Sequence, residues 1–153
     1  MLRAVFLLPL LCLALLSAPF SAHAVMEIQV VGGAANKIAL VMLPFQPAPG
    51  QPTPRLEQIA GDDLKRSGQF NLLDTGGAQS PADLSQVDAG AWRGKGTEAL
   101  VVGQVVAAPN GRFEVRFRLL DAVRQTQLAA YSFTISAGQW RATAHQIADI
   151  IYE

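Results

Sequence analysis

The sequence predicts an α/β domain in which two or three helices cover a mixed sheet of five or six strands. Continuous aliphatic runs at 37–45 and 99–107 are typical of strands covered on both faces. A strictly alternating run at 113–120 is typical of a strand with one face in water. Apolar residues at helical spacing follow Pro54 and return from Gln139 onward. Because strand and helix patterns alternate along the chain, we expect the helices to cover the sheet.

The amino terminus has the organisation of a cleavable export signal over residues 1–24. A positively charged start precedes an apolar run at 4–16. Ala22 and Ala24 are the small residues that signal peptidase requires before its cut, so we expect cleavage between Ala24 and Val25. An apolar run of about 13 residues is roughly 20 Å long as a helix, short of a hydrocarbon core of about 30 Å, so a membrane anchor is the weaker interpretation. The mature chain is expected outside the cytoplasm, peripheral to the envelope, with no transmembrane segment.

The single cysteine, Cys12, lies inside this signal. Leu11 precedes it where a lipidated cysteine needs a small residue, so we do not expect a lipoprotein. Cleavage removes the only thiol and leaves no disulfide or thiolate metal site. The chain carries 12 Lys and Arg against 12 Asp and Glu, so no long-range field attracts nucleic acid, and no nucleic-acid partner is expected.

Residues 25–36 are predicted to form an extended segment ahead of a folded domain at 37–153. Apolar and polar side chains alternate loosely at its start, before Gly32 and Gly33 interrupt the pattern. The alternating residues are Val25, Met26, Glu27, Ile28, Gln29, Val30 and Val31. Such a segment can add a strand to a partner's sheet or pair with this domain's own sheet, and the pattern leaves both interpretations open.

The folded domain is predicted to begin with a central strand at 37–45. Pro44 lacks a backbone N–H and ends the hydrogen-bonding capacity of this strand. A Pro- and Gly-rich loop follows at 46–53. Thr53 is predicted to cap the next helix, because its hydroxyl can accept from the first free N–H groups and Pro54 suits the first helical position.

This helix is predicted to end at Gly68, which can adopt the left-handed conformation of a C-terminal cap. Lys65 and Arg66 lie in its last turn, at the negative end of the helix dipole. A short strand at 70–74 and a polar linker at 75–88 follow.

The second half of the domain is predicted to be a short helix and then an antiparallel meander. The helix covers 89–95, and the first strand of the meander covers 99–107. An Asn-Gly pair at 110–111 predicts a hairpin into the strand at 113–120. A second turn near Arg124 and Gln125 leads into a strand at 127–136, and the resulting antiparallel meander is predicted to have one wet face.

A final helix is predicted from Gln139 onward. Its apolar stripe consists of Trp140, Ala144, Ile147 and Ile151. The pattern continues to Glu153 without a cap, so we expect the sequence to be part of a longer protein.

No catalytic residue, metal site or cofactor is predicted. His145 is the one histidine left after cleavage, and it supplies too few ligands for a transition metal. A G-x-S-x-G turn is missing, so a serine nucleophile is not indicated. Asp62 and Asp63 point about 100° apart on a helix and are interpreted as solvated charges, as His145 is interpreted as a surface residue.

The remaining charged and aromatic side chains also have structural interpretations. Arg112, Arg116 and Arg118 interleave with Glu114 and are predicted to form the wet face of the sheet, with an acidic-partner patch as the less favoured interpretation. The two tryptophans, Trp92 and Trp140, are expected to pack in or beside the core.

The succession of motifs along the chain resembles the amino-terminal domain of the TolB family. The motifs are KIALVMLPF at 37–45, DLKRSGQFNLLD at 63–74, Ala91-Trp92, EALVVGQV at 98–105, and the Trp140 helix. The resemblance covers essentially the whole chain in order and implies a fold like that of anticodon-binding domains.

The resemblance implies a periplasmic, non-enzymatic subunit of the Tol-Pal system, which keeps the outer membrane intact and constricting during cell division. Family members carry this domain ahead of a six-bladed β-propeller that binds Pal, so Pal is a partner only if a propeller follows. The first mature residues of the family bind the periplasmic domain of TolA. Residues 25–33 correspond here, and Val25 to Val31 are the predicted partner-binding residues.

Two other classes of protein compete with this interpretation. One is an outer-membrane regulatory or secretion-assembly domain of the peptidoglycan-synthase-activator or curli type, which shares similar strand motifs but is normally lipidated. The other is an enzyme, perhaps a hydrolase, for which the sequence offers no nucleophile and base constellation.

Overall fold

The computed structural model describes residues 37–50 and 55–153. The predicted signal peptide at 1–24, the predicted extended segment at 25–36 and the predicted helix start at Thr53 lie outside the described residues. Those predictions therefore remain predictions.

Five strands form one mixed sheet in the order β2-β1-β3-β4-β5. Their bounds are β1 (Ile38–Met42), β2 (Phe70–Leu72), β3 (Ala99–Ala108), β4 (Arg112–Asp121) and β5 (Thr126–Ile135). β1 pairs in parallel with β2 and β3, whereas β3, β4 and β5 form an antiparallel meander. This arrangement confirms the predicted α/β class with a mixed five-stranded sheet.

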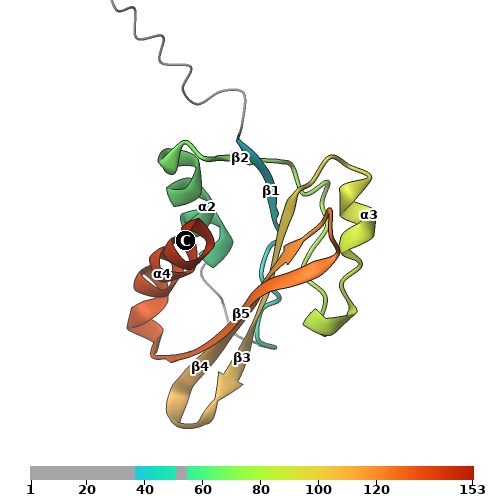
Figure 1. The fold of residues 1–153 in the computed structure, drawn as a ribbon. Helices are drawn as coiled ribbons and strands as arrows, with labels where there is room; N and C mark the ends of the chain where they lie inside the picture. Colours follow the sequence, from blue (N-terminus) through green and yellow to red (C-terminus); the bar gives the residue numbers. More distant parts are fainter. Residues whose placement is uncertain (1–36, 51–54) are drawn as a thin grey trace, which may run out of the picture. The chain divides into compact units, whose positions relative to one another are not determined.

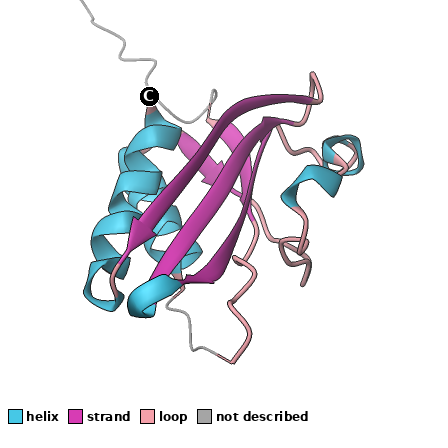
Figure 2. Cartoon of the chain, turned by 90° about the horizontal axis from the view of Figure 1, so that it is seen from below, coloured by secondary structure: helices cyan, strands magenta, loops and turns pink. Residues whose placement is uncertain are grey.

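The two long helices cover one face of this sheet and a short helix lies on the other. Figure 1 shows α2 (Leu56–Ser67) and α4 (Trp140–Tyr152) side by side on one side, and α3 (Ala89–Arg93) on the opposite side. The sheet lies between these two layers when it is viewed along the direction of Figure 2.

The larger of two apolar cores lies between the sheet and α2 and α4. Leu40, Val101 and Phe117 from the sheet pack there with Leu64 of α2 and Ile147 of α4, all of them buried. Periodicity explains this layer. Alternate residues of a strand line one face of the sheet, and residues three or four apart line one face of a helix, so the two apolar faces can pack together.

The smaller core lies on the opposite face, under α3 and the preceding loop. Val41, Leu100 and Val102 contact Leu84 and Trp92 there. The interpretation of Trp92 as a packing residue is thus confirmed. Because both faces of β1 and β3 are covered, their aliphatic runs are unbroken.

The chain continues beside β3 after β1 ends at Met42. Leu43 donates to the Val101 carbonyl at 2.9 Å, and Gln46 donates to the Gly103 carbonyl at 2.9 Å. Pro44, which has no N–H to donate, lies between these bonds. The strand is therefore shorter than the predicted 37–45. The chain nevertheless stays hydrogen-bonded to β3 as far as Gln46.

Gly103 lies where the ring of Phe45 crosses β3. A Cβ atom at Gly103 would be 2.5 Å from Cε2 and Cζ of that ring, so the strand admits only glycine there without displacement of the ring. The Gly103 N–H donates to Oγ of the buried Ser80 at 3.0 Å.

The described part of α2 begins at Leu56, and its end agrees with the prediction. Arg55 precedes Leu56 and its side chain makes no capping hydrogen bond, whereas the predicted cap by Thr53 with Pro54 lies outside the described residues. Gly68 ends the helix with φ at +77° and donates to the Lys65 carbonyl at 3.1 Å, as predicted.

Two tight turns close the meander. Asn110 and Gly111 have φ of 60° and 68°, which confirms the hairpin between β3 and β4. Gln125 has φ of 57° in the turn between β4 and β5, and the β4–β5 register shifts between Leu119 and Leu120.

Candidate functional site

The residues predicted from sequence to act on other molecules lie outside the described residues. These are the cleavage residues Ala22, Ala24 and Val25, and the partner-binding residues Val25 to Val31. The structure brings none of them together, so the candidate surfaces described below come from the folded domain.

An apolar cavity of about 460 Å³ opens beside Ile38, the first residue of β1. Its lining consists of Ile38, Leu40, Phe70, Glu98, Ala99, Leu119, Asp121, Val123, Arg124, Leu128 and Ile151. Ile38 is 41% exposed and Leu128 is 58% exposed, so apolar surface reaches the mouth of the cavity. Cavities of this size, mostly apolar with a few polar groups, suit a small ligand or the side chains of a bound segment.

The turn between β4 and β5 holds the charged groups at this mouth in place. The Asp121 carboxylate accepts hydrogen bonds from the backbone N–H groups of Val123 and Arg124 and from the Arg124 guanidinium, at 2.8–2.9 Å. The backbone and side-chain hydrogen bonds from Arg124 lower the pKa of Asp121. The carboxylate thus fixes the turn rather than acting as a free acid or base.

His145 and Asp63 join α4 to α2. Nδ1 of His145 lies 2.5 Å from Oδ2 of Asp63, and Arg66 pairs with the other oxygen of the same carboxylate. An ionised carboxylate only accepts, so Nδ1 carries the shared proton. This hydrogen bond is the main reason that the pKa of Asp63 lies below its ordinary value. The interpretation of Asp63 as a merely solvated charge is wrong, whereas His145, with a side chain 41% exposed, is at the surface as predicted.

The face of the sheet turned away from α2 and α4 carries a polar cluster on β4 and β5. Arg116 lies 2.5 Å from one Glu114 oxygen, and the Ser132 hydroxyl donates to the other at 2.6 Å. These bonds lower the pKa of Glu114 to about 2, the Arg116 bond contributing most. The predicted wet face is confirmed, and Arg118 reaches the Leu84 carbonyl at 3.3 Å.

A hollow of about 380 Å³ lies on this polar face and reaches β5. Its lining consists of Asp83, Leu84, Ser85, Gln104, Arg116, Phe117, Arg118, Ala130, Tyr131 and Ser132. Sequence reasoning missed this hollow and the cavity beside Ile38, because each gathers residues from several elements. The detectable signal was the uncharged stretch at 127–136, whose Leu128 and Tyr131 are exposed.

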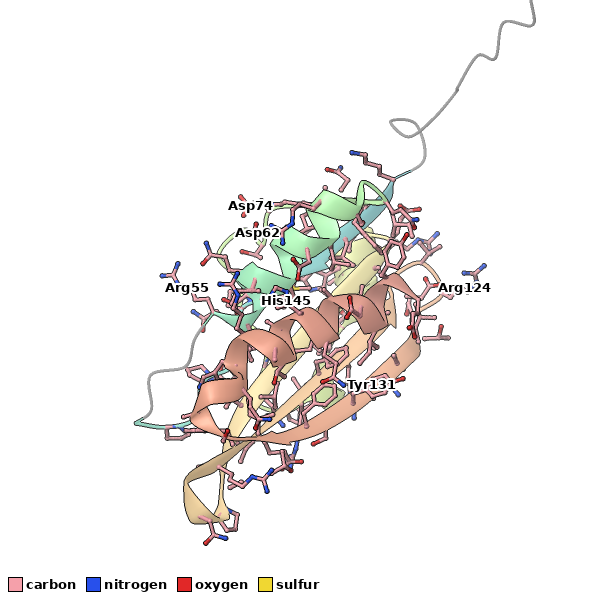
Figure 3. The ribbon with its side chains drawn as sticks, turned by 90° about the vertical axis from the view of Figure 1, so that its left-hand side faces the viewer. Arg55, Asp62, Asp74, Arg124, Tyr131 and His145 are labelled. Carbon is pink, nitrogen blue, oxygen red and sulfur yellow. The ribbon has the colours of Figure 1, made fainter. Side chains whose placement is uncertain are left out.

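No group of three or more His, Cys, Asp or Glu that could hold a metal ion occurs within residues 37–50 and 55–153. Over the same residues, the structure contains no helix long and apolar enough to cross a bilayer. Figure 3 shows His145 on α4 beside α2 and Arg124 at the far end of the sheet, so these two groups belong to separate surfaces.

The fold and these surfaces define a class: small α/β domains with two helices on one face of a mixed sheet and hollows suited to contacts with other molecules. A family model described as the TolB amino-terminal domain matches residues 26–128. The chain belongs to this family.

The comparison with known proteins gives the same family over the whole chain. The chain is 64% identical over 153 residues to the Tol-Pal system protein TolB of Thiobacillus denitrificans, and this match covers 100% of the chain but 36% of the relative. The crystal structure of TolB from Acinetobacter baumannii matches with a TM-score of 0.64 and 27% identity, over 80% of this chain and 29% of that one. The chain therefore spans about a third of the length of these relatives.

One further structural likeness concerns the fold alone. The C-terminal domain of LpoB from Salmonella enterica matches with a TM-score of 0.50 and 11% identity, over 68% of this chain and 86% of that one. It shows that the two domains share an architecture, and an architecture does not assign a function.

Proposed function

We propose that the chain is a periplasmic protein-interaction subunit of the Tol-Pal system, without enzymatic activity. The observation that carries the proposal is the 64% identity to a Tol-Pal system protein over all 153 residues. In this role the protein helps maintain outer-membrane integrity and envelope constriction during cell division. Pal is a partner only if a propeller follows this domain in the natural protein.

Binding of the periplasmic domain of TolA is assigned to Val25 to Val31. The alternation of Met26 and Ile28 with Glu27 and Gln29 supports this assignment, because an extended segment of this kind can add a strand to an exposed sheet edge. Backbone hydrogen bonds then provide affinity, and alternate side chains provide selectivity.

Calorimetry with the TolA periplasmic domain tests the assignment. Deletion of Val25–Val31 is expected to abolish binding, and Ile28→Asn is expected to weaken it by about tenfold or more because an apolar contact is lost. Gln29→Asn is the matched control on the other side of the strand and is expected to have little effect. Unchanged affinity after the deletion would show that the segment is not the binding element.

A further inference from the structure

β5 is one of two edges of the described sheet, and the two edges differ. β2, at the other edge, has three residues, whereas β5 has ten and contains neither a charged residue nor a proline. Natural sheets protect their edges from unwanted pairing with short strands, charges and prolines. By these criteria the β2 edge is protected and the β5 edge is open to a further strand.

The side of β5 that faces α4 offers an uncovered apolar row. The Tyr131 ring stacks on Phe117 of β4 with centroids 5.7 Å apart and on Phe133 with centroids 6.2 Å apart. Tyr131 is nevertheless 47% exposed. Leu128 lies at the register shift, lines the cavity together with Leu119 and Ile151 of α4, and is 58% exposed. Figure 3 shows Tyr131 near α4 on this side of the sheet. Apolar side chains on an added strand would cover this row, as cross-strand pairs do within a sheet.

The opposite side of β5 gives access to Arg116. Opposite Arg118 and Arg116, β5 places the small side chains of Ala130 and Ser132 on this side. Neighbouring strands lie about 4.8 Å apart, so an added strand would lie about 10 Å from β4. An arginine and a glutamate side chain together span such a gap.

The hydrogen-bond balance on this side favours an acidic partner. Both oxygens of Glu114 already accept, one from Ser132 and one from Arg116. Arg116 gives one of its five N–H donors to this bond, so the cluster offers donors to a partner. A carboxylate that approaches from an added strand matches this excess.

We propose that β5 receives an extended segment of a partner protein as a sixth strand, with alternating apolar and acidic side chains. The apolar side chains cover Tyr131 and Leu128, and the acidic ones reach Arg116. A second copy of β5 fits less well, because its sequence, TQLAAYSFTI, supplies no carboxylate. This surface is distinct from Val25–Val31, which the proposed function assigns to strand addition on a partner's own sheet.

Fluorescence anisotropy of the intact protein with labelled peptides tests this proposal. The probe is a blocked heptapeptide that alternates valine and glutamate, compared with one that alternates valine and lysine and with one N-methylated at alternate backbone nitrogens. The lysine peptide is expected to bind about tenfold more weakly, and the N-methylated peptide likewise, because it loses backbone donors to the β5 edge.

Three variants locate the binding surface. Tyr131→Lys places a charge on the edge and is expected to weaken glutamate-peptide binding about tenfold. Asn71→Lys is the matched control on the β2 edge and is expected to leave binding unchanged. Arg116→Gln, on the exposed face, is expected to reduce the preference for glutamate over lysine by about fivefold.

Several outcomes would overturn the proposal. They are no binding of the glutamate peptide up to about 1 mM, equal binding of the N-methylated peptide, or equal effects of the two lysine substitutions. Circular dichroism shows whether Tyr131→Lys is folded, and Arg116→Gln provides the test if it is not. Deletion of Val25–Val31 is expected to leave peptide binding unchanged, and loss of binding on this deletion would show that β5 is not the receiving strand.

Discussion

The contact between Gly103 and Phe45 yields a sharp prediction about stability. Gly103→Ala places a methyl group 2.5 Å from two carbons of the Phe45 ring, closer than real Cβ atoms approach other atoms. Phe45 is 8% exposed and belongs to the larger core, so its ring cannot turn away without loss of packing. Gly103 has no positive φ, so backbone strain is not part of the effect.

The expected loss of stability follows from two opposing contributions. Insertion of a methyl group into a well-packed core costs about 1–3 kcal/mol. Replacement of glycine by alanine restricts the unfolded chain and offsets about 0.4–1 kcal/mol of this cost. The 2.5 Å approach places the insertion cost in the upper part of its range, about 2–3 kcal/mol, so the net loss in the free energy of unfolding is about 1–2.6 kcal/mol. Each kcal/mol lowers Tm by roughly 3–6 °C in a domain of this size.

Urea unfolding followed by tryptophan fluorescence measures this loss. Gly94→Ala is the matched control, because its Cβ would meet only the Ala91 carbonyl oxygen at 3.6 Å and its φ is −60°. We expect the control to lie within about 0.5 kcal/mol of the parent or above it. Phe45→Leu in the Gly103→Ala background should recover part of the loss. A Gly103→Ala variant as stable as the parent would refute the assignment of this glycine to close ring packing.

Three further predictions concern ionisation and buried hydrogen bonds. The pKa of Glu114 is about 2, below its ordinary 4.5, so its stabilising contribution is complete above about pH 4.5 and is lost as pH falls toward 2. Glu114→Gln should therefore reduce the decline of the urea midpoint between these two pH values. His145→Ala should raise the pKa of Asp63 toward its ordinary value of 3.8, and carboxyl-carbon NMR titration that found no rise would contradict the assigned hydrogen bond. Ser80→Ala removes the acceptor of the buried Gly103 N–H and should cost about 1–3 kcal/mol in urea unfolding, whereas Ser85→Ala, at an exposed site, should cost less.

Most of the fold could be predicted from local sequence patterns. The hairpin at Asn110 and Gly111 was predictable because few residues other than Asn and Gly tolerate positive φ. The end of α2 at Gly68 was predictable for the same reason. The position of Leu56 at the beginning of α2 was not predictable in the same way, because its full burial depends on packing against other elements.

Contacts between distant parts of the chain could not be predicted from the sequence. Asp63 and His145 lie 82 positions apart, and only the packing of α2 against α4 brings them together. The cavity beside Ile38 likewise combines strands, a turn and a helix end. Periodicity tells which face of an element is apolar but not which element will cover it.

The parallel pairing of β1 with β3 cannot form until the chain between the two strands has been synthesised. The Glu98 carboxylate accepts a hydrogen bond from the Ala39 N–H, and the two residues are 59 positions apart. A polypeptide that appears amino terminus first presents the apolar strand Ile38–Met42 long before β3 is available, whereas β3, β4 and β5 can pair as soon as they appear. During this interval β2 can pair with one edge of this strand, and the other edge has no partner. This edge of β1 is therefore a place where the emerging chain depends on protection from unwanted pairing.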